Sequence, residues 1–272
     1  MTNEEIIAPV QKEYHLYQEE YTRYTQNPTP LLQEVEKYLA HIPGKQIRPL
    51  LLLLTAKACG HPSRRHILLA TAVEMLHNAT LMHDDVVDET DTRRGHDSIR
   101  HRWGNQVAVL CGDYYLSQVM TILHRVGNNE ITKQVAHTVA TMCTGELKQL
   151  SIASKKNTTK DTYIDIIGSK TASLMALCCK LGAMQTTQAS NETYLKAMYE
   201  FGYHYGLIFQ IRDDALDTQN PHDIGFPDGF QPQNEIDKHS TLARQALDTL
   251  PQSDARNALG SLLLPTSPSP NK

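Results

Sequence analysis

The chain has 272 residues, of which 40% are hydrophobic and 21% charged, and 26 basic against 30 acidic side chains give a net charge of −4 at pH 7. This composition is typical of a globular protein and excludes a disordered or fibrous one. No dense run of Lys or Arg marks a surface for tracking phosphates, so we expect no nucleic-acid partner. The longest apolar run, residues 50–56, is far shorter than the roughly 20 residues that span a bilayer, so we expect no integral membrane protein.

The first residues include Asn3, Glu4 and Glu5, where a secretory signal carries positive charge and then an apolar stretch. We therefore expect the protein to remain in the cytoplasm.

Helical spacing of apolar residues dominates the chain, and alternating strand patterns are rare, so the sequence predicts an all-α fold. In chain order, helices are expected over about residues 4–25, 31–41, 48–59, 64–88, 107–125, 131–150, 160–181, 192–217 and 237–249. No gap between them is long enough for an interdomain linker, so residues 1–264 are expected to form one domain. The Pro- and Ser-rich end, residues 265–272, is expected to be disordered.

The first expected helix carries four tyrosines on one face, at Tyr14, Tyr17, Tyr21 and Tyr24. Their steps of three, four and three residues follow the helical period. Such a stripe requires burial, either against the core of the same chain or in a dimer contact.

Two acidic motifs of identical spacing each end an apolar helix. Residues 84–88 read Asp-Asp-Val-Val-Asp, and residues 213–217 read Asp-Asp-Ala-Leu-Asp. Residues three and four apart share a helix face, so each motif projects its first and last carboxylates one turn apart. Partly buried carboxylates repel one another, which predicts a bound cation. Oxygen ligands at this spacing favour Mg²⁺, which is commonly shared with substrate phosphates, whereas zinc would require nitrogen or sulfur ligands.

Basic side chains stand where an anionic substrate would need them. Lys45 and Arg48 lie at an expected helix start, where backbone N–H groups also favour anions. Arg93 and Arg94 follow the first acidic motif, and Lys170 lies on a third apolar helix. Their grouping with the acidic motifs indicates a site for phosphate groups.

In this order the motifs resemble the trans-isoprenyl diphosphate synthases, the polyprenyl synthetase family. The similarity covers roughly residues 31–217, and the matching segments are residues 44–49, 74–77, 81–95, 112–114, 145–149, 170–172 and 209–217. The resemblance implies a single-domain bundle of long helices around a deep central cavity, and a homodimer.

The resemblance also implies roles for individual residues. The principal Mg²⁺ ligands would be Asp84, Asp88 and Asp213, with Asp85, Asp214 and Asp217 completing two acidic walls. The allylic diphosphate would be held by Arg93, Lys170 and Gln210, with Thr171 beside it, and isopentenyl diphosphate by Lys45, Arg48, His77 and Arg94. The catalytic residues would be Asp84, Asp85, Asp88, Arg93, Lys170 and Asp213.

The implied reaction is Mg²⁺-dependent ionisation of an allylic diphosphate, followed by attack of the isopentenyl diphosphate double bond. Fixed cations stabilise the departing diphosphate, and an apolar cavity shields the allylic cation from water.

The residues that precede the first acidic motif on its helix are expected to set the product length. Ala79 and Thr80 are small where short-chain family members carry an aromatic residue, so we expect products longer than farnesyl. Leu76 and Met75 would be the next obstruction, about one turn or more deeper.

The chain departs from the family pattern after the second motif. Gly225 is followed by Phe226 where the family has a lysine, and Lys238, the next candidate for binding diphosphate, precedes Thr241 by one residue more than usual. A second hypothesis is therefore a weakly active or non-catalytic partner subunit of a prenyl synthase heteromer. A third is another Mg²⁺-dependent diphosphate enzyme, such as a terpene cyclase, or a phosphohydrolase that uses His83 and Asp84.

Overall fold

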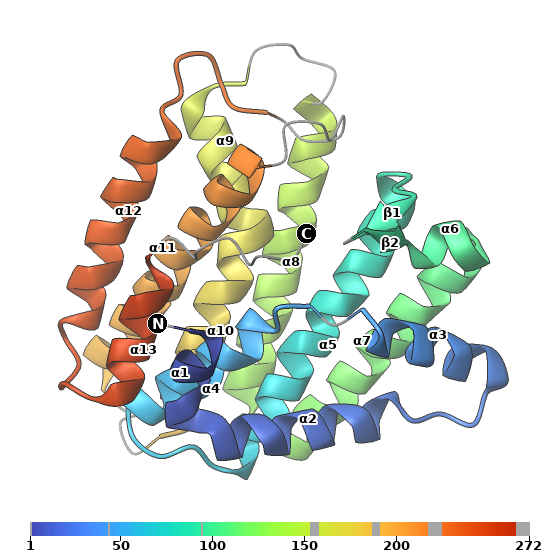
Figure 1. The fold of residues 1–272 in the computed structure, drawn as a ribbon, viewed down its shortest axis with the longest axis horizontal. Coiled ribbons are helices and arrows are strands. Elements are labelled where there is room, and N and C mark those ends of the chain that lie inside the picture. The colour runs from blue at the N-terminus through green and yellow to red at the C-terminus, as the bar shows by residue number, and fades with distance from the viewer. Residues whose placement is uncertain are drawn as a thin grey trace.

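Long helices make up almost all of the computed structural model (Figure 1), which describes residues 2–42, 44–93, 95–152, 158–186, 191–216 and 225–264. The predicted all-α fold is confirmed. The elements are α1 (Asn3–Ile7), η1 (Ala8–Val10), α2 (Gln11–Thr25), α3 (Pro30–Ala40), α4 (Ile47–Ala58), α5 (Arg64–Val87), β1 (Thr92–Arg93), β2 (His96–Asp97), α6 (Ile99–Trp103), α7 (Asn105–Val126), α8 (Asn129–Ile152), α9 (Lys160–Ile167), η2 (Gly168–Ala172), α10 (Ser173–Met184), α11 (Glu192–Leu216), α12 (Pro232–Leu247) and α13 (Asp254–Leu262).

Two expected helices are interrupted. The first is divided by the 3₁₀ turn η1, which contains Pro9, a residue that lacks the N–H needed inside an α-helix. The helix expected over 160–181 is divided by η2, a π-helical turn that contains Lys170 and Thr171. Turns of this kind insert one residue into the helical repeat and are frequent at functional sites.

Four short elements escaped the sequence analysis. The strands β1 and β2 form an antiparallel hairpin just after α5, and α6 follows them. The helix α13 begins after Ser253, whose hydroxyl accepts a hydrogen bond from the Arg256 N–H at 3.2 Å and so caps the helix. The sequence signal for α13 was therefore present in the Ser-Asp pair at 253–254.

The core lies where α4, α5, α10 and α11 pack together at the centre of the bundle (Figure 1). Leu51, Leu52, Leu53 and Leu54 of α4 have no exposed surface. One helical run of the described chain, Lys160–Met184, is long and apolar enough to cross a membrane, but 83% of its most apolar window is buried inside the protein. That burial is what a central core helix requires.

The tyrosine stripe of α2 packs against the same chain. Tyr17 is fully buried and Tyr24 is 8% exposed, while Tyr14 and Tyr21 are partly buried against the core. Of the two interpretations of the stripe, packing on the parent core is confirmed.

Two glycines let neighbouring helices approach η2 closely. A Cβ atom on Gly145 of α8 would lie 2.7 Å from the Cβ of Ser169. A Cβ on Gly206 of α11 would lie 2.5 Å from the Cα of Ala172. The backbone of η2 is thus held between α8 and α11, and this contact sets the positions of Lys170 and Thr171.

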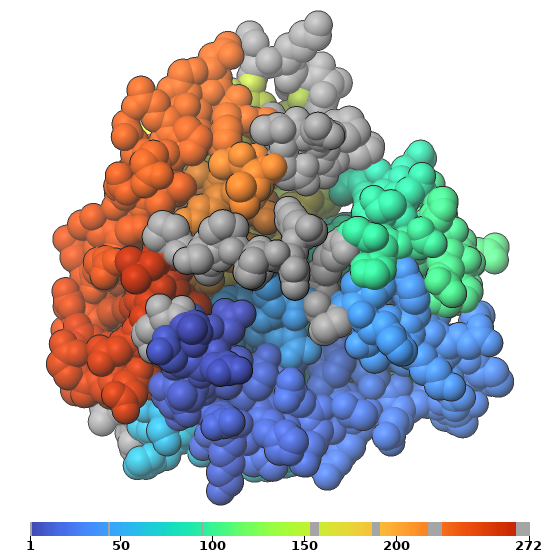
Figure 2. Space-filling model, in the orientation of Figure 1, coloured from blue at the N-terminus to red at the C-terminus, as the bar shows by residue number. Residues whose placement is uncertain are grey.

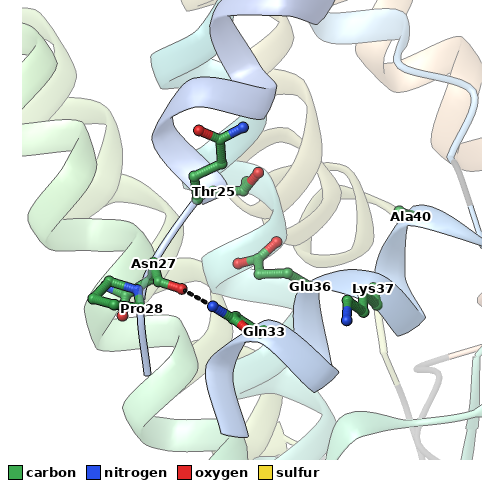
Figure 3. A pocket seen from close by; sticks show the side chains of 8 residues that line it. Thr25, Asn27, Pro28, Gln33, Glu36, Lys37 and Ala40 are labelled. Atoms are coloured by element: carbon green, nitrogen blue, oxygen red, sulfur yellow. Dashed lines mark hydrogen bonds between the residues drawn. The ribbon is translucent and has the colours of Figure 1, made fainter. Parts of the chain in front are cut away.

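A groove of about 510 Å³ lies between the end of α2 and α3 (Figure 3) and contains none of the predicted site residues. Glu36 projects into it from α3 and accepts a hydrogen bond from the Tyr115 hydroxyl at 2.9 Å on Oε2. Its Oε1 is buried and has no hydrogen-bond partner among the described residues. Burial raises the pKa of Glu36 to about 7, and the bond from Tyr115 offsets part of that effect.

We expect Gly206→Ala to lower the free energy of unfolding by roughly 1–3 kcal/mol, because the added methyl meets backbone atoms that cannot move aside. Gly260→Ala in α13 is the control, since its methyl would come no closer than 3.8 Å to Leu247. That change should be neutral or stabilising, because Ala favours a helix more than Gly does. Urea denaturation measures both, and equal losses would contradict the close packing of η2.

We expect stability to fall as the pH rises from about 4.5 to about 7, because folded Glu36 retains a proton that the unfolded chain releases near its ordinary pKa of 4.5. Glu36→Gln should remove this dependence and raise the free energy of unfolding at pH 8 by roughly 1–3 kcal/mol. Denaturation at several pH values tests this, with Glu34→Gln on the exposed side of α3 as the control. The same pH profile in wild type and Glu36→Gln would exclude Glu36 as the source.

Candidate active site

The first acidic motif lies at the C-terminal end of α5, beside a lysine of η2. Burial raises the pKa of Asp84 to about 6; the charge of Lys170 opposes this shift and that of Glu146 adds to it. Asp88, one turn further along, is half-buried, and its backbone N–H donates to the Asp84 carbonyl at 2.8 Å. The charge of Asp88 adds to the rise in the pKa of Asp84, as expected for two carboxylates on one helix face.

Asp85 has a different environment from Asp84 and Asp88. It is 3% exposed, and its Oδ1 accepts from Nε of Arg93 at 2.7 Å and pairs with Nη2 at 2.6 Å. Burial raises the pKa of Asp85, and the hydrogen bond from Arg93 opposes that rise. This ion pair ties the hairpin strand β1 to α5 and holds the Arg93 side chain beside the acidic motif.

Lys170 links η2 to α8 and α5. Its Nζ lies 2.5 Å from Oε2 of Glu146. Burial alone would lower the pKa of Lys170, but the bond to Glu146 and the charges of Asp84 and Asp88 outweigh it, so the pKa is raised. Oε1 of Glu146 is buried without a hydrogen-bond partner among the described residues. A cation is therefore fixed beside the first acidic motif.

The second acidic motif ends α11 and is linked through Gln210 to Thr171, the next residue of η2. The hydroxyl of Thr171 donates to Oε1 of Gln210 at 2.8 Å, and Nε2 of Gln210 donates to Oδ1 of Asp214 at 2.6 Å. The Tyr163 hydroxyl donates to Oδ2 of Asp214 at 2.5 Å. The side chain of Asp213 is exposed. Consecutive residues of η2 thus act on different motifs: the charge of Lys170 influences Asp84 and Asp88, and Thr171 is linked to Asp214 through Gln210.

The residues predicted to bind isopentenyl diphosphate come from α4, α5 and the segment before α4. Lys45 is exposed, and its Nζ lies 6.0 Å from the ring centre of Phe209, next to Gln210. Arg48 is buried in α4, and His77 is half-buried in α5. The structure thus brings Lys45 to the helix that carries the second acidic motif.

Three predicted residues are not placed at this site. Lys238 is exposed on α12, where its Nζ lies 3.8 Å from Oε2 of Glu235, and no contact among the described residues joins it to either acidic motif. Arg94 and Asp217 lie outside the described residues, as does the expected tail over 265–272. The roles of all three residues remain predictions.

The residues predicted to set product length follow α5 away from Asp84. Ala79 is fully buried, and Thr80 is half-buried with its hydroxyl donating to the His77 carbonyl at 2.8 Å. Met75 and Leu76 are buried further along the same helix. Ala79 and Thr80 are the two predicted positions nearest to the first acidic motif. Neither carries an aromatic side chain.

The donor atoms fit a hard divalent cation, because the carboxylates supply oxygen and no cysteine accompanies them. Among the described residues, no three His, Cys, Asp or Glu side chains are grouped closely enough to hold a metal alone. Mg²⁺ commonly takes only one or two carboxylates, with phosphate oxygens and water completing its shell. The acidic residues thus suit Mg²⁺ that is shared with a bound diphosphate.

Sequence reasoning missed two residues that organise the site, Glu146 and Tyr163. Glu146 follows Gly145 in a recognised motif but received no role. Tyr163 precedes Lys170 by seven residues, close to two helical turns, which would have placed it near the same face. Its bond to Asp214 comes from another helix, so the sequence spacing alone does not reveal it.

Comparison with known sequences gives one family and several relatives. The family model "Polyprenyl synthetase" matches residues 29–228. The chain is 35% identical over 201 residues to heptaprenyl diphosphate synthase component 2 of Bacillus subtilis (strain 168), covering 74% of this chain and 57% of that protein. It is 34% identical over 221 residues to the all-trans-nonaprenyl-diphosphate synthase (geranyl-diphosphate specific) of Rhodobacter capsulatus, covering 81% and 67%. The chain therefore spans only about three fifths to two thirds of these relatives.

Solved structures show the same fold. A decaprenyl diphosphate synthase from Rhodobacter capsulatus superposes with a TM-score of 0.84 at 26% identity, covering 95% of this chain and 96% of that one. A polyprenyl synthase from Caulobacter crescentus, solved with calcium and isoprenyl diphosphate, gives a TM-score of 0.88 at 23% identity over 96% of each chain. The chain has two acidic motifs of identical spacing, an all-α fold and these matches, and it belongs to the polyprenyl synthetase family.

Proposed function

We propose that this protein is a trans-polyprenyl diphosphate synthase, a prenyltransferase that condenses isopentenyl diphosphate with an allylic diphosphate to a product longer than farnesyl. The observation that carries the proposal is the position of η2 between the two acidic motifs: the charge of Lys170 compensates the first, and Thr171 is linked to Asp214 of the second through Gln210. The names of the relatives, heptaprenyl and nonaprenyl diphosphate synthases, support the same reaction class and long products.

Each group of residues has a task in this reaction. Asp84, Asp88 and Asp213 would hold Mg²⁺, which supplies positive charge to the leaving diphosphate when bound. Lys170 and Arg93 are held by Glu146 and Asp85, so they offer fixed N–H donors to an anion without reorganising. A neighbour solved with calcium and isoprenyl diphosphate supports a site that combines a divalent cation with a diphosphate.

The carbon chemistry needs shielding and orientation. The allylic C–O bond breaks, the double bond of isopentenyl diphosphate forms the new C–C bond, and a proton is lost to give the new double bond. Lys45, Arg48 and His77 would hold isopentenyl diphosphate for this attack. The apolar stretch of α5 before Asp84 would receive the tail and exclude water from the cation.

A homodimer is the assembly that we propose. Large apolar side chains are exposed on α7, at Leu110 (67%) and Met120 (70%), and on α8, at Leu147 (65%) and Leu150 (46%). Exposed apolar side chains of this size favour contact with a second copy.

A partner subunit is the second candidate, because the Bacillus subtilis relative is named as one component of its synthase and Phe226 stands where the family has a lysine. On this hypothesis the purified chain alone is inactive and gains activity when mixed with a homologous subunit.

We expect purified protein with Mg²⁺, isopentenyl diphosphate and an allylic diphosphate to form elongated polyprenyl diphosphates, read by mass spectrometry. Asp84→Ala should lower the rate roughly 10²–10³-fold, because the leaving diphosphate loses charge stabilisation. Asp237→Ala, which removes an exposed carboxylate of α12, is the control and should retain activity. If folded wild-type protein gives no product with any primer, the proposal fails for the isolated chain, and sedimentation with a homologous subunit tests the second candidate.

We expect Thr80→Phe to shorten the product while conversion continues, because an aromatic ring beside the first motif obstructs the tail along α5. Thr80→Ala leaves the passage open and should retain long products. Chromatography of the dephosphorylated products measures the chain lengths. An unchanged length distribution in Thr80→Phe would show that the tail does not follow this face of α5.

A further inference from the structure

We propose that Tyr163 is a positioning residue for the allylic diphosphate, acting through Asp214 on Gln210 and Thr171. The inference rests on the proposed function. It gives Asp213 and Asp214 different roles, which their shared motif does not distinguish. Asp214 would orient other side chains, whereas Asp213, with its exposed side chain, would be the principal candidate among the described residues of the second motif for binding the metal.

An aromatic cluster holds the Tyr163 ring. Tyr163 is 1% exposed, and its ring meets Phe226 edge-on at 5.6 Å and Phe230 at 5.0 Å between ring centres. Phe226 and Phe230 are themselves stacked, with centres 5.0 Å apart. Edge-to-face packing favours one ring orientation, so the hydroxyl has little freedom in where it points. Phe226 therefore has a defined structural use at the position where the family carries a lysine.

Both oxygens of Asp214 are occupied by protein donors. Oδ2 accepts from Tyr163 and Oδ1 accepts from Nε2 of Gln210. A metal ion that bound Asp214 would compete with these two hydrogen bonds. Because hydrogen bonds to an ionised acceptor are among the stronger ones in proteins, the carboxylate is held in place by Tyr163 and Gln210 together.

The hydrogen bonds among Asp214, Gln210 and Thr171 fix which group donates and which accepts at each contact. An ionised carboxylate only accepts, so Gln210 must turn its NH₂ group toward Asp214 and its carbonyl toward Thr171. The hydroxyl of Thr171 must then donate to that carbonyl. The remaining N–H of Gln210 is thereby given one fixed direction for binding an anion. Without Tyr163, Asp214 can rotate and the Gln210 amide loses this orientation.

The test is Tyr163→Phe, which removes the hydroxyl and keeps the ring. We expect the dissociation constant for inorganic pyrophosphate in the presence of Mg²⁺, measured by calorimetry, to rise roughly tenfold. The KM for the allylic diphosphate should rise by a similar factor, while the KM for isopentenyl diphosphate stays unchanged. Adding Tyr163→Phe to Gln210→Ala should cause little further loss, because both changes remove the same oriented amide.

The matched control is Tyr115→Phe. Tyr115 is also fully buried and also donates to a carboxylate, Glu36, which belongs to neither acidic motif. Both variants should lose similar thermal stability, and only Tyr163→Phe should lose pyrophosphate affinity. Phe226→Leu is a second variant that loosens the cluster and should weaken pyrophosphate binding in the same direction.

Wild-type pyrophosphate affinity in Tyr163→Phe, or equal rises in KM for both substrates, would overturn the inference. If Tyr163→Phe does not fold, unchanged pyrophosphate affinity in Phe226→Leu overturns it instead. Absence of product from the wild-type protein with every primer would count against the proposed function, and the pyrophosphate comparison would still decide the role of Tyr163.

Discussion

The compensation of buried negative charge by Lys170 is the interaction on which the site depends. The carboxylates at the end of α5 are partly withdrawn from water, and burial raises the pKa of Asp84 to about 6. Unbalanced, they would repel each other and weaken the helix end. Lys170 supplies the opposing charge from η2, and Glu146 holds its ammonium group in place. The cation that a diphosphate would meet is thus also part of the structure of the free protein.

The position of that lysine depends on backbone packing. Because η2 lies against Gly145 on one side and Gly206 on the other, side chains of α8 and α11 reach the same turn. Consecutive residues of the π-helical turn have different neighbours: Lys170 pairs with Glu146 of α8 and its charge acts on the α5 motif, whereas Thr171 donates to Gln210 of α11. The position of the charged group of Lys170 therefore depends on the close helix packing at Gly145 and Gly206.

The departure from the family pattern at Phe226 acquires a physical meaning in this arrangement. Its ring forms part of the aromatic cluster around Tyr163, whose hydroxyl reaches the second acidic motif. At the position where the resemblance implies a lysine, Phe226 contributes apolar packing against Tyr163 and Phe230. Figure 2 shows α12 and α13 along one side of the molecule.

The sequence by itself determined the helical class, the two acidic motifs with their spacing and the family, because helical period and motif order are local properties of the chain. It also placed Asp84 next to Asp88, since one turn of helix separates them. Only the tertiary structure decided which carboxylates pair with protein groups, as Asp85 does with Arg93 and Asp214 with Tyr163. The contact of Lys170 with Glu146 was likewise undetermined. These pairings join residues from different elements, and their geometry depends on how the helices pack.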